Sequence, residues 1–337
     1  MLSSIDHVKK SLHNMKKIDN LSLKCSFKSN ILISLLLGDT TEKMSVKEFE
    51  TYLLNEKHMA GNTVEAYKRD IASFSVFITE RGINKIEEAT NTEVVAYLMR
   101  LKQEGKAKAT VNRKLASIRT YYNYLMEKGK IRQNPATDIK SPKIERKGIE
   151  YLTVGEVNRL MNVPDQTEKG VRDRAILELL YATGIRASEL ISLEIDDVNV
   201  RMGFVTCQGE HIRARIIPIG RLGRKALEAY LYPYREEILK KHPEERCLFV
   251  NYVGKPITRQ GLWKILKEYG ERAGLEHKLT PQVLRNSFAV HMLQNGADLK
   301  SLQELLGHED ISATQIYLSV TKNRIKDVYD KTHPRAL

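Results

Sequence analysis

Two side chains near the end of the chain have types that could take part in catalysis. His308 stands nine residues before Tyr317 in the segment LLGHEDISATQIYLSV, residues 305–320. Imidazole and phenol groups can transfer protons or act as nucleophiles. A histidine and a tyrosine packed in a core would give the same pattern, so the pair by itself does not distinguish a catalytic site from a structural one.

Two arginines stand at defined positions near predicted helix ends. Arg186 lies in YATGIRASELISL, and Glu189 follows one helical turn later, where its carboxylate could hold the guanidinium group. Arg285 lies in TPQVLRNSFAVHML, where Thr280 and Pro281 are signals for a helix start. An ordinary surface ion pair is the alternative for Arg186, and the arginines alone do not indicate a function.

A basic helix is predicted in the first half of the chain, over TVNRKLASIRTYYNYL. Its polar and basic residues are Asn112, Arg113, Lys114 and Arg119, set against an apolar face of Leu115, Ile118, Tyr121 and Leu125. A solvated basic face explains this pattern. A helix in the major groove of DNA explains it equally, because asparagine and arginine read base edges there and lysine contacts phosphates.

The composition is that of a globular protein with a strong positive charge. The 337 residues are 42% apolar and 29% charged, a length that favours two domains and a tail. Lysine and arginine number 55 against 42 acidic residues, which gives a net charge of +13. A partner with dense negative charge is expected, and nucleic acid is the commonest such partner.

A membrane-spanning segment and an extracellular location are not expected. The longest apolar run, ILISLLL at 31–37, is far shorter than the roughly 20 residues of a spanning helix, and it lacks the features of a signal peptide. Cys25, Cys207 and Cys247 are odd in number and scattered, so they indicate neither a disulfide framework nor a metal site. The reducing cytoplasm is the expected location.

The first half of the chain predicts an extension, a helical domain and a linker. Residues 1–43 are poorly periodic and are interpreted as an extension of uncertain order. Residues 44–130 form the predicted helical-bundle domain, followed by the charged, proline-containing linker 131–148. Apolar residues at three- and four-residue spacing predict helices over 45–58, 64–82, 90–105 and 108–129, with Asn62 or Thr63 as N-cap of the second.

The remainder, residues 149–337, predicts a mostly helical α+β domain. Helices are expected over 152–163 and 171–184. The period then changes, and Phe204–Thr206 and Ile216–Pro218 predict two antiparallel strands around a polar turn. Helices are expected from residue 221 to the end. The fold class is therefore mostly α with one small antiparallel sheet.

Three segments of this second domain resemble the boxes of the tyrosine site-specific recombinases, or phage integrases, and most closely the bacterial Xer type. They are LYATGIRASELISL, TPQVLRNSFAVHMLQNGADLKSLQELLGH and ISATQIY. NTVEAYKRDIASF and TVNRKLASIRTYYNYL resemble the core-binding helical domain of the same family, which binds DNA. The similarity runs from about residue 45 to the terminal HPRAL.

The resemblance implies a role for each of the four candidate residues. Tyr317 would attack a DNA phosphodiester, which leaves a 3′-phosphotyrosyl link and a free 5′-hydroxyl. Arg186 and Arg285 would bind the non-bridging oxygens of the phosphate and stabilise its transition state. His308 would hydrogen-bond the same phosphate. This chemistry requires no metal and no other cofactor, and the sequence contains no Walker motif and no metal-ligand cluster.

Two residues expected from the family are replaced. The second box normally begins with a histidine three residues before its arginine, and Gln282 stands there. The lysine that protonates the departing 5′-oxygen falls on Glu210. His211 and Arg213, with Arg215, are the nearest cations that could substitute, although arginine is a poor acid.

The sequence therefore leaves two main readings. The first is a recombinase that cleaves and rejoins double-stranded DNA, as a homo- or hetero-tetramer on paired sites that exchanges C-terminal segments, here residues 322–337. The second is a catalytically degenerate relative that binds DNA as an architectural protein. A membrane-surface or scaffold role is a third, weaker alternative.

Overall fold

The chain folds into two compact units. The computed structural model describes residues 47–143, 148–208 and 214–318. Its contacts divide the chain into Met1–Arg146 and Lys147–Leu337. The predicted extension 1–43 and the predicted exchange segment 322–337 lie outside the described residues.

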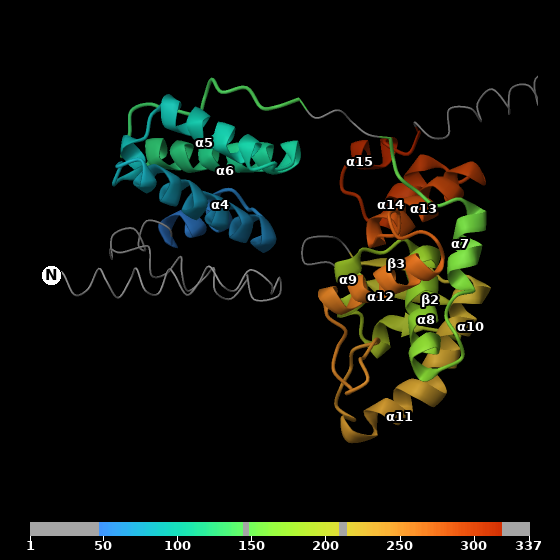
Figure 1. The fold of residues 1–337 in the computed structure, drawn as a ribbon. Helices are drawn as coiled ribbons and strands as arrows, with labels where there is room; N and C mark the ends of the chain where they lie inside the picture. The colour runs from blue at the N-terminus through green and yellow to red at the C-terminus, as the bar shows by residue number, and fades with distance from the viewer. Residues whose placement is uncertain (1–46, 144–147, 209–213, 319–337) are drawn as a thin grey trace, which may run out of the picture. The chain divides into compact units, whose positions relative to one another are not determined.

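The first unit is a bundle of helices (Figure 1). A helix over 47–51 continues into the π-helical turn η1 Tyr52–Glu56, and α4 Gly61–Glu80, η2 Ile86–Glu88, α5 Asn91–Gln103 and α6 Lys108–Glu127 follow. The apolar face of α6 is completely buried against α4 and α5, including Leu115, Ile118 and Leu125. The predicted N-cap of α4 is wrong. The helix begins at Gly61 after Ala60, which makes no side-chain cap, and Asn62 and Thr63 lie inside it.

The first part of the predicted linker packs against this bundle. Ala136 is fully buried in the bundle core, and Ile131 and Ile139 pack at its edge. The Asn134 side chain accepts a hydrogen bond from the backbone NH of Ala136 at 2.8 Å and donates one to Arg119 O at 3.1 Å. Residues 131–139 are therefore part of the folded unit.

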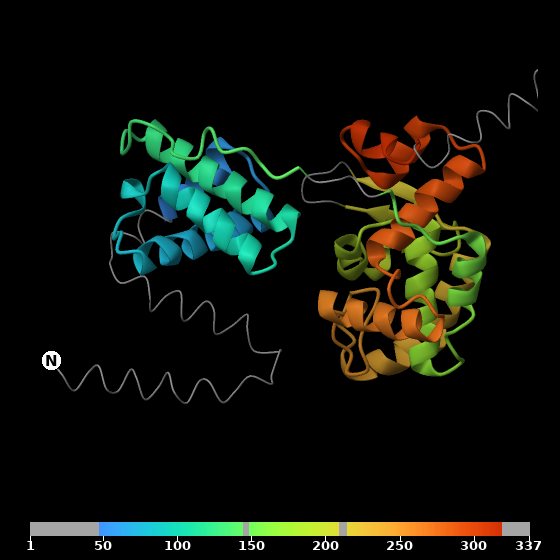
Figure 2. The same ribbon diagram turned by 45° about the horizontal axis from the view of Figure 1, so that its top comes forward.

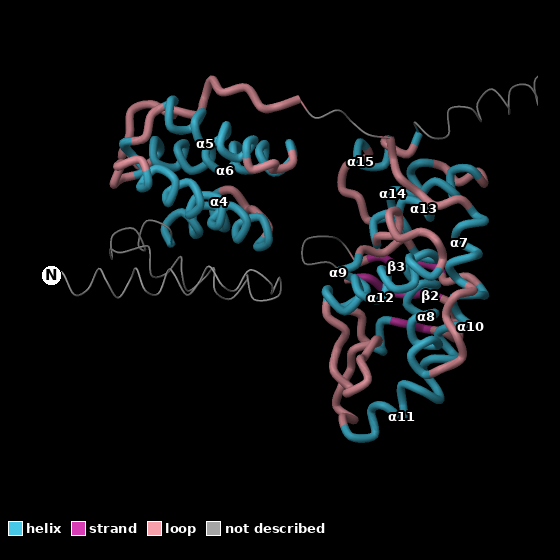
Figure 3. The backbone as a smooth tube through the Cα atoms, viewed as in Figure 1, coloured by secondary structure: helices cyan, strands magenta, loops and turns pink. Residues whose placement is uncertain are grey.

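The second unit is mostly helical (Figures 2 and 3), with a main core and a smaller apolar cluster that contains Tyr317. Its helices and helical turns are α7 Val154–Met161, α8 Glu168–Thr183, α9 Ala187–Ser192, η3 Ile195–Asp197, α10 Arg221–Ala229, η4 Tyr230–Arg235, α11 Glu236–Ile238, η5 Leu239–Lys241, α12 Arg259–Arg272, α13 Pro281–Gln294, α14 Leu299–Leu306 and α15 Ser312–Gln315. Helix α8 lies at the centre, in contact with α10 and α13, and most of its residues are buried because other elements cover several of its sides. The predicted mostly helical fold is confirmed.

The small sheet is antiparallel, as predicted, but it has three strands. β1 Val198–Asn199 pairs with β2 Phe204–Cys207, and β2 pairs with β3 Arg215–Pro218 in a register that places Cys207 opposite Arg215. The sequence did not indicate β1, because two residues are too few to show an alternating pattern. The prediction of helix from residue 221 onward is also wrong for 243–258, which is loop with isolated bridges of Glu194 to Cys247 and of Val250 to Pro256.

Candidate active site

The turn between α8 and α9 positions Arg186. Gly184 ends α8 with φ of 61°, a conformation that favours glycine, and a Cβ atom there would collide with the Phe288 ring. Arg186 then stands at the N-cap of α9. Its backbone NH donates to Glu189 Oε2 at 2.7 Å, so the start of the helix is held by the carboxylate that the sequence placed beside this arginine.

Helix α13 positions Arg285. Thr280 accepts a hydrogen bond from Val283 NH at 3.0 Å and Pro281 occupies the first turn, so the predicted helix start is confirmed. Arg285 follows in the next turn and is only 3% exposed. Its guanidinium group donates to Gly184 O at the end of α8.

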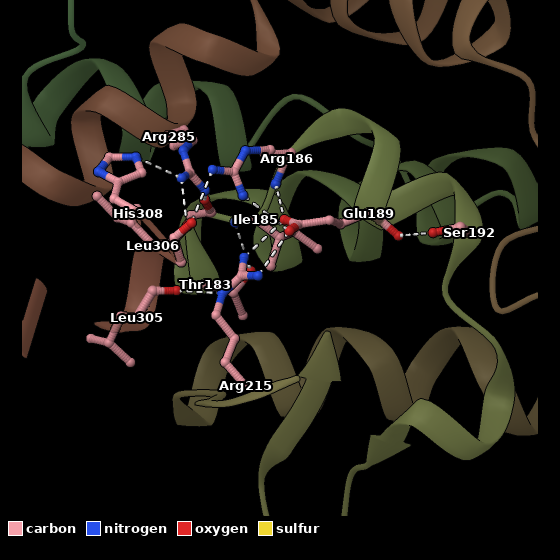
Figure 4. A network of polar contacts seen from close by, with 12 residues as sticks. Thr183, Ile185, Arg186, Glu189, Ser192, Arg215, Arg285, Leu305, Leu306 and His308 are labelled. Carbon is pink, nitrogen blue, oxygen red and sulfur yellow. Dashed lines mark hydrogen bonds and ion pairs between the residues drawn. The ribbon is translucent and has the colours of Figure 1, made fainter. Parts of the chain in front are cut away.

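The last carbonyl groups of α14 are each bound by a different arginine (Figure 4). Leu305 O accepts from Arg215 Nε at 2.8 Å, Leu306 O from Arg285 Nη2 at 2.7 Å, and Gly307 O from Arg186 Nη2 at 3.2 Å. The final carbonyls of a helix lack partners within the helix, and the C-terminal end of its dipole attracts cations. The end of α14 therefore gathers three guanidinium groups from three other parts of the chain.

Glu189 is the carboxylate within this cluster. Arg215 binds both of its oxygens, at 2.8 and 2.9 Å, and Arg186 Nη1 lies 3.2 Å from Oε1. Burial would raise the pKa of Glu189, but the hydrogen bonds from Arg215 and from the Arg186 backbone outweigh it and hold that pKa below its ordinary value. Arg215 is thus committed to Glu189, whereas the Arg186 side chain remains 35% exposed and accessible to an anion.

His308 joins the cluster through Arg285. Its Nε2 lies 3.0 Å from Arg285 Nη2, and its Nδ1 lies 2.8 Å from Thr314 Oγ1. Because a guanidinium group has no acceptor, Nε2 must accept, and the proton must lie on Nδ1 facing Thr314. Burial and then the charges of Arg285 and Arg186 lower the pKa of His308 to about 4. The imidazole is therefore neutral at neutral pH.

Tyr317 is buried beside this cluster in the same unit. It is 1% exposed and packs with Phe288 and Leu302, and its hydroxyl donates to Asn286 Oδ1 at 3.1 Å. Burial raises the pKa of Tyr317, and the positive charges of Arg285 and Arg186 act in the opposite direction. Tyr317 is therefore packed in an apolar cluster, as a structural tyrosine would be, and it is also close enough to Arg285 and Arg186 to be affected by their charge.

Of the two positions where the family's histidine and lysine are replaced, the structure describes only Gln282. Gln282 Nε2 donates to Asn286 Oδ1 at 2.8 Å, so the glutamine contacts the same amide oxygen as Tyr317. Glu210, His211 and Arg213 lie outside the described residues. The predictions for these three positions therefore remain predictions.

The four predicted DNA-contacting residues of α6 make contacts within their own unit. Arg113 and Lys114 both pair with the buried Asp70, Lys114 at 3.1 Å. The other two hold the chain that follows the helix: Asn112 donates to Pro142 O at 3.0 Å, and Arg119 donates to Ala136 O at 2.9 Å and to Ile139 O. The Arg113 side chain is 43% exposed and that of Lys114 is 12% exposed, so Arg113 is the more accessible of these two cations.

Several contacts of the site were not predicted from the sequence. The sequence indicates Arg215 only as a hairpin cation, and it does not single out Thr314 or Asn286. Within the described ranges, no group of three or more histidine, cysteine or acidic side chains is arranged to hold a metal ion. No helix there combines the length and apolar character needed to cross a membrane.

Comparison with known proteins identifies the family. Residues 150–324 match the phage integrase family, and residues 46–129 match the phage integrase N-terminal SAM-like domain. A tyrosine recombinase XerD from Oceanobacillus iheyensis is 42% identical over 87% of this chain and 99% of its own. A tyrosine recombinase XerD from Listeria monocytogenes is 41% identical over 86% of this chain and 99% of its own.

Solved structures share the fold. The XerH site-specific recombinase bound to palindromic difH substrate in a post-cleavage complex has a TM-score of 0.67 at 20% identity, covering 85% of this chain and 84% of that one. A lambda integrase dimer bound to a COC′ core site has a TM-score of 0.63 at 18% identity, covering 82% and 94%. The resemblance predicted from the three boxes is confirmed, and the chain belongs to the phage integrase family of tyrosine recombinases, which are DNA strand-exchange enzymes.

Proposed function

We propose that this chain carries out site-specific DNA recombination with Tyr317 as nucleophile. The tyrosine oxygen forms a bond to phosphorus, the bond from phosphorus to the 5′-oxygen breaks, and that oxygen leaves with a proton as a 5′-hydroxyl. Attack by the 5′-hydroxyl of another strand reverses the step and rejoins the DNA. The convergence of Arg186, Arg285 and His308 at the end of α14, in the same unit as Tyr317, is the observation that carries this proposal.

The arginines stabilise the charge that develops on the phosphate. Among the described residues, Arg285 bonds carbonyl oxygens and His308 but no carboxylate, and burial together with the charge of Arg186 lowers its pKa to about 10. A phosphate would relieve this concentration of positive charge, because charge-assisted hydrogen bonds to guanidinium groups are strong in a buried site. Arg186 and Arg285 are therefore assigned to the non-bridging oxygens.

His308 supplies the acceptor for the tyrosine proton. In the neutral form its Nε2 offers a lone pair, so His308 cannot donate a hydrogen bond to a phosphate from that atom until the atom is protonated. Transfer of the Tyr317 proton to Nε2 would create that donor, once the phosphate has replaced the imidazole as the partner of Arg285. Thr314 keeps the other ring nitrogen protonated throughout.

The alternative is a protein that binds DNA without cleaving it, and Gln282 is the observation that favours it. Its amide is bonded to Asn286, and an amide neither supplies nor accepts a proton. General acids and bases typically contribute about 10²–10⁴-fold each to a reaction rate. A chain in which neither Glu210 nor a neighbour replaces the family's lysine would therefore cleave slowly.

One set of substrates separates the two functions. A duplex selected by this protein from a random pool, carrying a nick beside the scissile phosphate, should trap a covalent adduct on a denaturing gel, and Tyr317→Phe should abolish it. A sulfur atom at the 5′-bridging position makes a leaving group that hardly needs protonation, so it should restore cleavage if only the acid is missing. Binding without a Tyr317-dependent adduct on either duplex would favour the architectural role.

The partner is double-stranded DNA, and the assembly is a homo- or hetero-tetramer on paired sites. The lambda integrase structure of the same fold, a dimer bound to a COC′ core site, supports this proposal. The net charge of +13 and the exposed Arg113 side chain support the same assignment, with α6 as the DNA-contacting helix of the first unit. A DNA substrate supports the cytoplasm as the proposed location of the protein.

A further inference from the structure

The hydroxyl group of Tyr317 is held in a position from which it cannot attack DNA. The side chain is 1% exposed, so a phosphodiester cannot contact it without movement of the surrounding segment. The hydroxyl donates to Asn286 Oδ1 at 3.1 Å. An amide oxygen is a hydrogen-bond acceptor but not a base near neutral pH, so this partner does not activate the phenol.

The orientation of the Asn286 amide is fixed by two further hydrogen bonds. Its Nδ2 donates to Glu150 O at 2.9 Å, and its Oδ1 accepts from Gln282 Nε2 at 2.8 Å. Because the nitrogen has a carbonyl partner and the oxygen has a donor partner, the network itself assigns the two ends of the amide. The oxygen therefore faces Tyr317.

We propose that Asn286 is a positioning residue that retains the Tyr317 hydroxyl in the DNA-free protein, with Gln282 and Glu150 fixing the amide that does so. This inference rests on the proposed function, because it assigns a role in that reaction to a side chain outside the arginine cluster. It also gives Gln282, which stands where the family has a histidine, a positive function. Release of the hydroxyl from Asn286 then precedes proton transfer to His308.

The chain that enters the second unit contributes to the same arrangement. Leu152 NH donates to Ser287 Oγ at 2.8 Å, next to Asn286 on α13. Ile149 and Tyr151 pack against the apolar cluster that contains Tyr317. Segment 149–152 therefore contacts both the retaining amide and the packing of the tyrosine, so a change in its course would weaken both.

Hydrogen exchange of the DNA-free protein tests the retention without any cleavage. The amides of Thr314, Gln315 and Tyr317 are hydrogen-bonded within 311–317 and report on whether this segment is in place. Tyr317→Phe and Asn286→Ala should each raise their exchange rates by about tenfold, the effect of one lost buried hydrogen bond. Tyr317→Phe keeps the ring and leaves Asn286 bonded to Gln282, so it isolates the contact.

The double variant gives the decisive result. If both changes remove the same bond, the exchange rates of Asn286→Ala/Tyr317→Phe should equal those of the faster single variant. Multiplied effects, or parental exchange in Tyr317→Phe, would overturn the proposal. Asn295→Ala is the matched control, because the Asn295 side chain donates to the carbonyl of His291 at the end of the same helix, so its loss should leave 311–317 unchanged.

Cleavage provides a second measurement. With saturating nicked duplex in a single turnover, Asn286→Ala should form the adduct about tenfold faster at unchanged DNA affinity, since the resting arrangement is weakened by one hydrogen bond. An unchanged or slower rate would overturn the proposal. Absence of adduct in every form, the parent included, would instead count against the proposed function, while the exchange result would still decide whether Asn286 retains Tyr317.

Discussion

The two units each contain a buried carboxylate that gathers two cations, with different consequences. In the first unit, Asp70 pairs with Arg113 and Lys114 and also accepts from Ser117 Oγ at 2.8 Å. In the second unit, Glu189 pairs with Arg186 and Arg215. Both carboxylates are less than a tenth exposed, at 2% and 8%. Around Asp70 the positive charge exceeds the negative charge by one.

Around Glu189 the excess of positive over negative charge is larger, because Arg285 adds a third guanidinium group. Among the described residues, the partners of Arg285 are carbonyl groups and His308. These contacts satisfy its hydrogen bonds but do not neutralise its charge. A carboxylate therefore serves as the structural anchor in both units, while the larger excess of positive charge lies at the end of α14. The difference shows that the partners of a basic residue, more than its type, decide whether it is available to bind DNA.

Removal of Arg186 should have the largest effect. Arg186→Ala takes one preorganised charge from the transition state and should reduce adduct formation by about 10²–10³-fold while DNA affinity is nearly unchanged. The measurement is single-turnover cleavage of the nicked duplex. Arg246→Ala is the control, since Arg246 forms exposed ion pairs with Glu194 and Asp196. Cleavage by Arg186→Ala at the parental rate would show that the active site lies elsewhere.

Neutralisation of Asp70 should have an intermediate effect and should act on stability. Asp70→Asn removes the charge that holds Arg113 and Lys114, and should lower the free energy of opening of α6 by about 1–3 kcal/mol. Hydrogen exchange of the α6 amides measures this change. Glu104→Gln, which breaks an exposed pair with Arg100, should cost at most about 0.5 kcal/mol. Equal effects of the two variants would mean that Asp70 is not an anchor.

The smallest effect is expected for Arg113 and appears in the salt dependence of DNA binding. If its exposed guanidinium contacts one phosphate, Arg113→Ala should reduce the slope of log K against log salt by about 0.9. Arg119→Ala should instead lower stability, because Arg119 holds the carbonyl groups of Ala136 and Ile139. DNA-binding titrations at several salt concentrations distinguish the effect of Arg113→Ala from that of Arg119→Ala. A reduced slope with unchanged stability for Arg119→Ala would assign that residue to DNA as well.

Elements with strong local signals were predictable from the sequence. The apolar spacing predicted α4, α5 and α6, and the turn between two alternating segments predicted β2 and β3 within one residue at each end. The errors fall where local signals are weak. Ala60 precedes α4 without a side-chain cap, β1 has two residues, and the loop 243–258 has one backbone bridge to the distant Glu194 and one within itself.

The residue types, their order and the resemblance of the three boxes predicted Arg186, Arg285, His308 and Tyr317 as a set, and placed them on helices and turns. Their present partners were not predictable. Arg186 meets Gly307 across 121 positions of sequence, Arg215 meets Leu305 across 90, and Tyr317 meets Asn286 across 31. Helix and strand signals act over a few residues, whereas these contacts depend on how α8, α13 and α14 pack against one another. The resemblance carried by the local sequence therefore indicated which side chains are available for the proposed chemistry, and only the packing of distant helices decided that three arginines share one helix end while the tyrosine hydroxyl donates to an asparagine.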